Sequence, residues 1–330
     1  MAIFSHNEVV NWELEQQREE HPTWYRASYL AEQVLAKSDP LYRYHFPSNV
    51  QCSRARTQLG NKIALYNIMS ATIWPLETNE ERCPFKWLLE GEERDLRRIV
   101  GCTGLCPRLM HTYAQITHLS AKLYKDPQRL TAQKLASAIS QRLNNFWQWS
   151  DLSEGYQTSQ ELINSCELDE NGKVFSPIKT TELVAETYAA AAQIYLYCRL
   201  MRKSRRHPKV QEVLARLLWC IDRMPTSGPL FTAQHAQLRV FIAAVVACEP
   251  YHRRLIRNWF EELVDGTRGN VPPVWRTVQF MWGWLDARFH SIEQEEIDHS
   301  SEMEIDTNAE AWWEVMVADI YAREGKLNLA

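Results

Sequence analysis

The sequence has no long hydrophobic run. Its longest apolar stretch, residues 240–248, is too short to cross a bilayer, which takes about 20 residues. The opening residues, MAIFSHNEVVNWELEQQREEH, turn polar and charged after Phe4 and lack the apolar core of a secretory signal. The eight cysteines in 330 residues are too sparse for a disulfide framework. These absences predict an intracellular protein with reduced cysteines that does not enter a membrane.

An excess of positive charge is missing too. Lysine and arginine number 37 against 41 aspartates and glutamates, which gives a formal net charge of -4. A protein without a positive field has little with which to hold a phosphate backbone. We therefore expect that this chain does not bind nucleic acid directly.

Catalytic and cofactor signatures are also absent. The sequence contains no GxSxG elbow, P-loop, Rossmann fingerprint, HExxH helix or Asp-rich motif for a magnesium diphosphate. Cys102 and Cys106 have no matching second pair, and we interpret them as small buried thiols. A mononuclear metal site that adds His111 is the alternative. The sequence thus predicts neither a bound metal nor a cofactor.

The sequence does contain helical periodicity along its whole length. Strand signals are confined to residues 167–175, where Asn171-Gly172 could turn a short hairpin. Helices are predicted over residues 5–20, 24–37, 49–74, 91–100, 107–125, 128–149, 158–166, 180–202, 208–223, 231–248, 250–264, 273–290 and 308–323. The acidic segment 293–308 is poor in apolar residues and is predicted to be a mobile loop. We predict an all-α fold in which residues 1–330 form one large multi-helix domain.

The order of elements over residues 181–260 is characteristic. It combines a helix apolar on nearly every face, a basic turn, an irregular Pro-Gly segment and further helices. The pieces are TELVAETYAAAAQIYLYCRL (181–200), RRHPKVQEVL (205–214), MPTSGPLFTAQ (224–234) and FIAAVVACEP (241–250), with matching segments at 83–123 and 312–318. This order resembles the C-terminal regulatory domain of fungal binuclear zinc-cluster transcription factors. The resemblance implies a helical domain that restrains or mediates activation and senses metabolites.

The sequence departs from that family in lacking the zinc cluster. Its eight cysteines do not form the closely spaced group of six that such a module requires. Because Met1 leads directly into a capped helix, we interpret the chain as a stand-alone protein. The alternative is the non-enzymatic, effector-sensing domain of such a factor, which would place it in the nucleus rather than the cytoplasm.

Aromatic residues suggest what a stand-alone protein of this fold would do. The 13 tryptophans and 13 tyrosines either pack between helices and hold them together or line a cavity for a hydrophobic ligand. We expect a terpenoid or polyketide of secondary metabolism. A pocket of this kind could accelerate a cyclisation or a Diels–Alder-type cycloaddition by holding a reactive conformer, which makes a cofactor-free cyclase or pericyclase the expected activity. A homodimer is left open.

Candidate ligand-binding residues lie on the apolar helix at 180–202. Glu182, Glu186 and Gln193 share one stripe of this helix, with Tyr188 nearby. A buried carboxylate must be paired or must line a wet cavity, so pairing with an arginine and pocket lining are the two interpretations. The basic run that follows, residues 202–209, is interpreted as a solvated turn that complements the helix dipole.

A second group of candidates lies on the helix at 107–125. His111, Gln115 and His118 are spaced to share one face, and Tyr113 lies beside them. This face is either exposed to solvent or lines a cavity, where His118 could act as an acid or a base.

The last candidates lie near the C-terminal half of the chain. Gln234 and His235 open the helix predicted at 231–248, whose positive end could bind a ligand carbonyl. They are the predicted catalytic residues together with His118. Trp282 is the predicted wall of a pocket.

Overall fold

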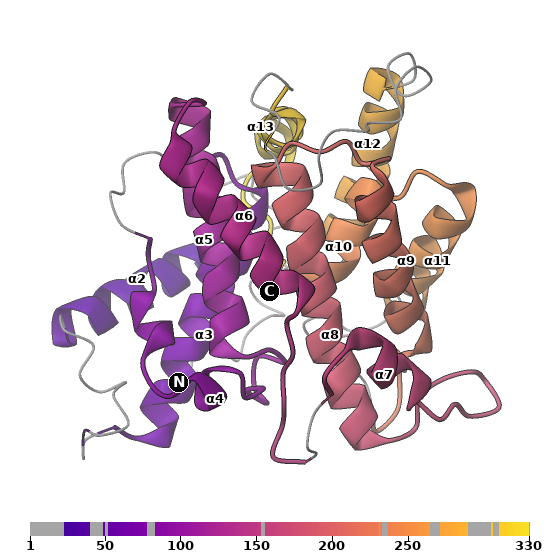
Figure 1. Cartoon of the computed structure of the whole chain (residues 1–330). Coiled ribbons are helices and arrows are strands. Elements are labelled where there is room, and N and C mark those ends of the chain that lie inside the picture. The colour runs from indigo at the N-terminus through magenta and orange to yellow at the C-terminus, as the bar shows by residue number, and fades with distance from the viewer. Residues whose placement is uncertain are drawn as a thin grey trace.

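Helices form almost all of the secondary structure in the computed structural model (Figure 1). The structure describes residues 23–39, 49, 52–77, 83–152, 156–230, 232, 237–264, 271–289, 305 and 310–329. The helices are α2 (Thr23–Ser38), α3 (Arg54–Ser70), η3 (Ala71–Ile73), η4 (Lys86–Leu89), α4 (Glu93–Leu96), α5 (Pro107–Lys125), α6 (Leu130–Asn144), α7 (Ser159–Asn164), α8 (Pro177–Tyr195), η5 (Leu196–Leu200), α9 (Pro208–Arg223), α10 (Gln237–Val246), α11 (Pro250–Val264), α12 (Val271–Phe289) and α13 (Trp312–Glu324). Within these residues, β-structure is limited to isolated bridges between single residues, and no strand forms. The all-α prediction is therefore confirmed.

Local sequence signals set the start of several helices. Pro107, Pro177 and Pro208 each occupy the first turn of a helix, where the missing N–H costs nothing and the fixed φ suits the helix. The hydroxyl of Thr158 and the carboxylate of Glu161 form a capping box at α7, which satisfies orphan backbone donors. These helices therefore begin where their own residues specify.

Two helices form the centre of the molecule. α8 packs against α5, α6, α7, α9 and α10, and α10 packs against α8, α9, α11 and α12 (Figure 1). Every residue of α10 is buried, as are most residues of α8. Burial of this apolar surface is the main force that holds the helices together. The buried apolar side chains form one cluster from Ala64 to Leu329, while the single domain over residues 1–330 stays a prediction.

The C-terminal helix returns to the N-terminal half of the chain. α13 packs against η3, η5 and α12, whereas α2 packs on α3 and α3 on α5. Arg199, in the π-helical turn η5, joins these parts: it forms two hydrogen bonds with the Glu314 carboxylate, at 2.7 and 2.9 Å. Its guanidinium also donates to the carbonyls of Ala71, Thr72 and Trp74, at 2.9, 2.9 and 3.0 Å. The buried guanidinium of Arg199 therefore holds the backbone between the end of α3 and Trp74 by hydrogen bonds.

The helix predicted over residues 91–100 is wrong in length. Only one turn forms, because the backbone from Arg97 to Ile99 pairs with Trp149 instead: Ile99 N donates to Trp149 O at 2.7 Å and Trp149 N donates to Arg97 O at 3.2 Å. The residue with a positive φ in the following turn is Gly104. A Cβ there would lie 2.9 Å from Val184 on α8, so the loop needs glycine to approach that helix.

The interpretation of residues 202–209 as a solvated turn is also wrong. Lys203, Arg205 and His207 are buried. The guanidinium of Arg205 lies 5.5 Å from the centre of the Phe289 ring and 3.7 Å from a carboxylate oxygen of Asp286. α12 therefore contacts Arg205, and alternate residues of the basic run are buried rather than solvated.

Other boundaries differ by a few residues. α6 ends at Asn144 rather than at residue 149. The start of the helix predicted at 231–248 lies mostly outside the described residues, which show α10 from Gln237 to Val246. The predicted hairpin at 167–175 is reduced to a bridge between Leu168 and Val174. The predicted helix at 5–20 and nearly all of the predicted loop at 293–308 lie outside the described residues.

Candidate functional site

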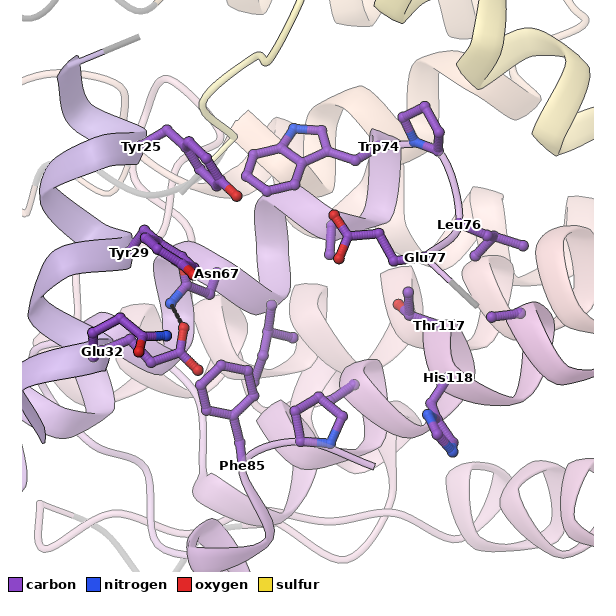
Figure 2. Close-up of a pocket in the computed structure, with 17 residues that line it drawn as sticks. Tyr25, Tyr29, Glu32, Asn67, Trp74, Leu76, Glu77, Phe85, Thr117 and His118 are labelled. Carbon is purple, nitrogen blue, oxygen red and sulfur yellow. Dashed lines mark hydrogen bonds between the residues drawn. The ribbon is translucent and has the colours of Figure 1, made fainter. Parts of the chain in front are cut away.

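An aromatic-lined cavity of about 400 Å³ opens between α2, α3, α5 and the segments near residues 74–77 and 84–85 (Figure 2). We call it the aromatic cavity. Its wall includes four aromatic side chains from three parts of the chain: Tyr25, Tyr29, Trp74 and Phe85. Ligand pockets in proteins typically enclose about 300–1,000 Å³ and are lined mainly by apolar and aromatic groups. The cavity has the size and lining of a small-molecule site.

The aromatic wall is held together by ring contacts. Tyr25 meets Trp74 edge to face, with ring centres 4.9 Å apart, and stacks on Tyr29 at 6.2 Å. The ammonium of Lys326 lies 3.5 Å from the centre of the Tyr25 ring and 4.5 Å from that of Trp74, a cation–π arrangement. Burial, Glu77 and Glu32 raise the pKa of Tyr25. The C-terminal segment therefore fixes this wall.

Most polar groups in the aromatic cavity already have partners. Asn67 donates to the Glu32 carboxylate at 2.7 Å, as Figure 2 shows, and accepts from Ser28 at 2.9 Å. Thr117 shares a hydrogen bond with Tyr195, between hydroxyl oxygens 2.8 Å apart. The cavity thus offers a ligand an apolar surface with a few pre-positioned polar groups.

Phe85 is the unusual residue of this wall. Its φ is 58°, in the left-handed region that a bulky side chain rarely adopts. Such conformations cost on the order of 1–3 kcal/mol and gather at functional sites. Phe85 lines the aromatic cavity, and Figure 2 shows its ring beside the Glu32 side chain of α2.

A second cavity, of about 300 Å³, lies beside the first. We call it the basic cavity, because Lys122, Arg129 and Arg142 line it together with Gln115 and His118. His118 lines both cavities. Burial, Lys122 and Arg129 lower the pKa of His118, so its imidazole is neutral at pH 7. Gln115 and His118, two of the residues predicted to share one face of α5, therefore both line a cavity.

His111 departs from that face. Its side chain is buried, with Nε2 3.8 Å from Sγ of Cys83, and it does not line either cavity. Burial, Arg108 and Arg142 lower its pKa to about 4. His111 is therefore a neutral core residue behind the site rather than a group that faces a ligand.

Stability should consequently depend on pH through His111. Between about pH 6.5 and pH 4 an unfolded chain protonates this histidine while the folded protein does not, so the free energy of unfolding falls as the pH falls, by roughly 2–3 kcal/mol. In His111→Gln this contribution disappears and urea unfolding curves should show a flatter dependence from pH 7 to pH 4. An unchanged slope in the variant would contradict the assignment.

A third cavity, of about 790 Å³, lies between α6, α7, α8 and α9. It contains Glu186 and Gln193, which were both predicted to bind a ligand. Glu186 is buried and is held by Arg216 at 3.2 Å, Ser159 at 2.6 Å and Tyr156 at 3.1 Å. Pairing of Glu186 with an arginine is thus confirmed, and Gln193 also accepts from Arg216. We call this space the polar cavity.

The other predicted site residues lie in the core. Tyr113 is fully buried and donates to the carbonyl of Tyr188 at 2.7 Å. Trp282 is buried and its indole donates to the carbonyl of Ala244 at 2.9 Å. None of these three lines the aromatic, basic or polar cavity, because their helices turn them toward neighbouring helices. Gln234 and His235 lie outside the described residues.

Metal ligation finds no support in the described parts of the chain. They contain no cluster of three or more histidine, cysteine, aspartate or glutamate side chains arranged to hold an ion. Cys106 is buried, and burial raises the pKa of its thiol to about 12, which disfavours the thiolate that a metal needs. Cys102 and Cys106 are free thiols.

Among the described residues, no helix is both long and apolar enough to traverse a membrane.

Sequence reasoning missed most of the aromatic wall. Tyr25 and Tyr29 are one turn apart on α2, a spacing that places them on one face, and this was the available signal. Trp74 and Phe85 lie in irregular segments whose positions no periodicity predicts. Arg129 precedes α6 and Arg142 lies in its last turn, and the sequence does not show that α6 brings both side chains to the cavity beside α5.

Comparison with known families gives a result that agrees with this fold. The family model described as the fungal specific transcription factor domain matches residues 23–323. No curated protein and no solved structure shows a significant match to the chain. The matched range includes every residue named above for the aromatic and basic cavities except Lys326.

Proposed function

The chain belongs to the family of fungal specific transcription factor domains, and from this we propose that it is a regulatory module that binds a small, largely apolar metabolite. The observation that carries the proposal is the aromatic cavity, with its wall of Tyr25, Tyr29, Trp74 and Phe85. A terpenoid or polyketide of secondary metabolism has the apolar body that such a wall accommodates. The metabolite would be the effector through which the domain senses a metabolic state.

The arrangement of the cavity supports a sensing role. Its wall draws on α2, α3 and α5 and is closed by Lys326 from the far end of the chain. A ligand in this place contacts elements that are distant in sequence, so its binding energy stabilises their mutual packing. A ligand present at 100 times its dissociation constant stabilises the folded state by about 2.7 kcal/mol.

A fluorescence titration tests the proposal. N-phenyl-1-naphthylamine is neutral and aromatic and fluoresces strongly in apolar surroundings. We expect saturable binding of one probe per chain, a higher urea midpoint when the probe is present, and displacement by terpenoid or polyketide metabolites that fit the cavity. Absence of saturable binding would overturn the proposal.

A cofactor-free cyclase or pericyclase is the second candidate. The observation that favours it is the position of His118 at the edge of the aromatic cavity, with its pKa lowered by burial and by nearby cations. A neutral imidazole there can accept or relay a proton, while the aromatic wall holds a reactive conformer. The distinguishing measurement is product formation from candidate polyene substrates against a buffer blank, with His118→Gln as the variant.

Partners and location follow from the proposal. Its partner is a hydrophobic small molecule, and direct contact with nucleic acid is not required of this chain. A regulatory module of this family acts inside the cell, in the nucleus when it serves a transcription factor and in the cytoplasm when it serves as an enzyme. A homodimer stays a prediction that sedimentation analysis can test.

A further inference from the structure

The aromatic cavity and the basic cavity share the wall formed by α5. Neighbouring stripes of this helix face the two spaces: Ala114, Thr117 and Ala121 line the aromatic cavity, and Gln115, Leu119 and Lys122 line the basic cavity. His118 lies between the stripes and lines both. Residues three and four apart on a helix are surface neighbours. A molecule in one cavity is therefore next to the other.

The segment at 83–85 repeats this relation on the opposite side. Cys83 lines the basic cavity, whereas Pro84 and Phe85 line the aromatic cavity. Because adjacent residues of one short segment face both spaces, the two cavities meet along two of their walls.

The two cavities differ in charge. Lys122, Arg129 and Arg142 line the basic cavity, and none of the described residues that line it is an aspartate or glutamate. Glu93 acts on Arg142 electrostatically but does not line the cavity. Arg129 and Arg142 form no ion pair with any described residue. Burial and Arg108 lower the pKa of Arg142, against the opposite effect of Glu93, so burial and a like charge make the cation of Arg142 less favourable there. An anion in this cavity would relieve that cost.

The aromatic cavity has the opposite lining. The carboxylates of Glu32 and Glu77 line it together with the neutral His118, and no lysine or arginine is among the described lining residues. The ammonium of Lys326 lies against two aromatic rings of its wall. Carboxylates repel an anion, so the charged end of a ligand has no place there. The apolar and hydroxyl-bearing part of a ligand fits this side, and the charged part fits the basic side.

We propose that the ligand is an anionic amphiphile, with an apolar ring system in the aromatic cavity and a carboxylate or other acidic group in the basic cavity. This inference rests on the proposed function and adds the chemical class of the ligand. Arg142 and Arg129 are the anion-binding residues, because a guanidinium forms paired hydrogen bonds with planar anions. His118 lies at the junction between the two parts.

Two probes with one ring system test the inference. N-phenyl-1-naphthylamine is neutral, and 8-anilinonaphthalene-1-sulfonate carries the same rings with an added sulfonate. We expect the sulfonate to bind about tenfold more tightly, since a hydrogen bond to a charged group contributes on this scale. In Arg142→Gln and Arg129→Gln the sulfonate should lose that advantage, while the neutral probe binds as before. Circular dichroism verifies that the variants fold.

Arg254→Gln is the matched control, because it removes one positive charge from an exposed position on α11 away from α5 and α6 (Figure 1). It should leave both affinities unchanged. Equal affinity of the two probes would overturn the inference and leave the proposed function standing. A tighter sulfonate that is insensitive to both arginine variants would also overturn it. Failure of both probes to bind would instead overturn the proposed function.

A second measurement reports on the junction. An anion beside His118 favours the imidazolium, so the sulfonate should raise the pKa of His118, and the neutral probe should not. NMR titration of the imidazole signal, assigned by comparison with His118→Gln, measures this difference. An unchanged pKa with the sulfonate bound would contradict the placement of the anion in the basic cavity.

Discussion

Replacement of Arg199 by methionine is expected to lower the free energy of unfolding by about 3–5 kcal/mol, because removal of one partner of a buried ion pair leaves the other charge uncompensated. The side chain of Arg199 is fully buried and that of Glu314 is only 10% exposed. The variant also removes the donor to the carbonyls of Ala71, Thr72 and Trp74. Urea unfolding followed by circular dichroism measures the loss.

The change should reach the aromatic cavity as well. Arg199 donates to the hydroxyl of Tyr195 at 2.7 Å, and this hydroxyl pairs with that of Thr117 on the cavity wall. Arg199 also fixes the backbone of Trp74. We therefore expect Arg199→Met to weaken binding of the neutral probe even under conditions in which the variant is still folded.

Arg239→Met is the matched control for Arg199. Arg239 is also buried, but no carboxylate of the described residues pairs with it. It donates to the carbonyl of Val184 at 3.1 Å and to the hydroxyl of Thr187, and it covers the Tyr188 ring with its guanidinium carbon 4.5 Å from the ring centre. Burial lowers its pKa.

Loss of Arg239 removes a buried cation that lacks a counter-ion, so the free energy of unfolding should change by less than about 1 kcal/mol. The double replacement of Arg199 and Glu314 by methionine should lose less than the sum of the two single replacements, because it leaves no unpaired charge. Equal losses in Arg199→Met and Arg239→Met would contradict this account of the buried charges.

Replacement of Ala71 by phenylalanine is expected to weaken binding in the aromatic cavity strongly. Ala71 lines this cavity as the first residue of η3 and is half-buried. A phenyl ring there occupies space that the ligand needs, and overpacking of this kind costs about 1–3 kcal/mol. The affinity of N-phenyl-1-naphthylamine should fall at least about tenfold, which fluorescence titration measures.

Ala215→Phe provides the matched control. Ala215 lines the polar cavity on α9, so the same side chain is added at a different cavity. We expect it to leave the affinity of the probe unchanged. If Ala215→Phe weakens binding and Ala71→Phe does not, the probe site is the polar cavity. Urea midpoints close to that of the parent protein show that both variants keep the fold.

Several elements of the fold could be predicted closely from the sequence. α5 and α9 have the bounds that Pro107 and Pro208 indicate at their starts, because a proline in the first turn is a local signal. The burial of α8 and α10 could be predicted because these helices have almost no polar face. Pairing of Glu186 with an arginine could also be foreseen, since a buried carboxylate requires a partner.

The failures share one cause. The segment after Glu93 has the charge pattern of a helix, yet pairing with Trp149 ends it after one turn. The basic run after Arg202 has the composition of an exposed turn, yet Asp286 and Phe289 of α12 cover part of it. In both places a contact with a residue distant in sequence outweighs the local preference.

The sequence by itself determined the helical class, the buried character of α8, and the starts of the helices that carry their own caps. These properties depend on periodicity and on side chains a few residues apart. Only the tertiary structure decided which aromatic residues line a cavity, that His118 stands between an aromatic and a basic space, and that Arg199 binds Glu314. Those relations join residues that are far apart in the sequence, and only the packing of the helices brings them into contact.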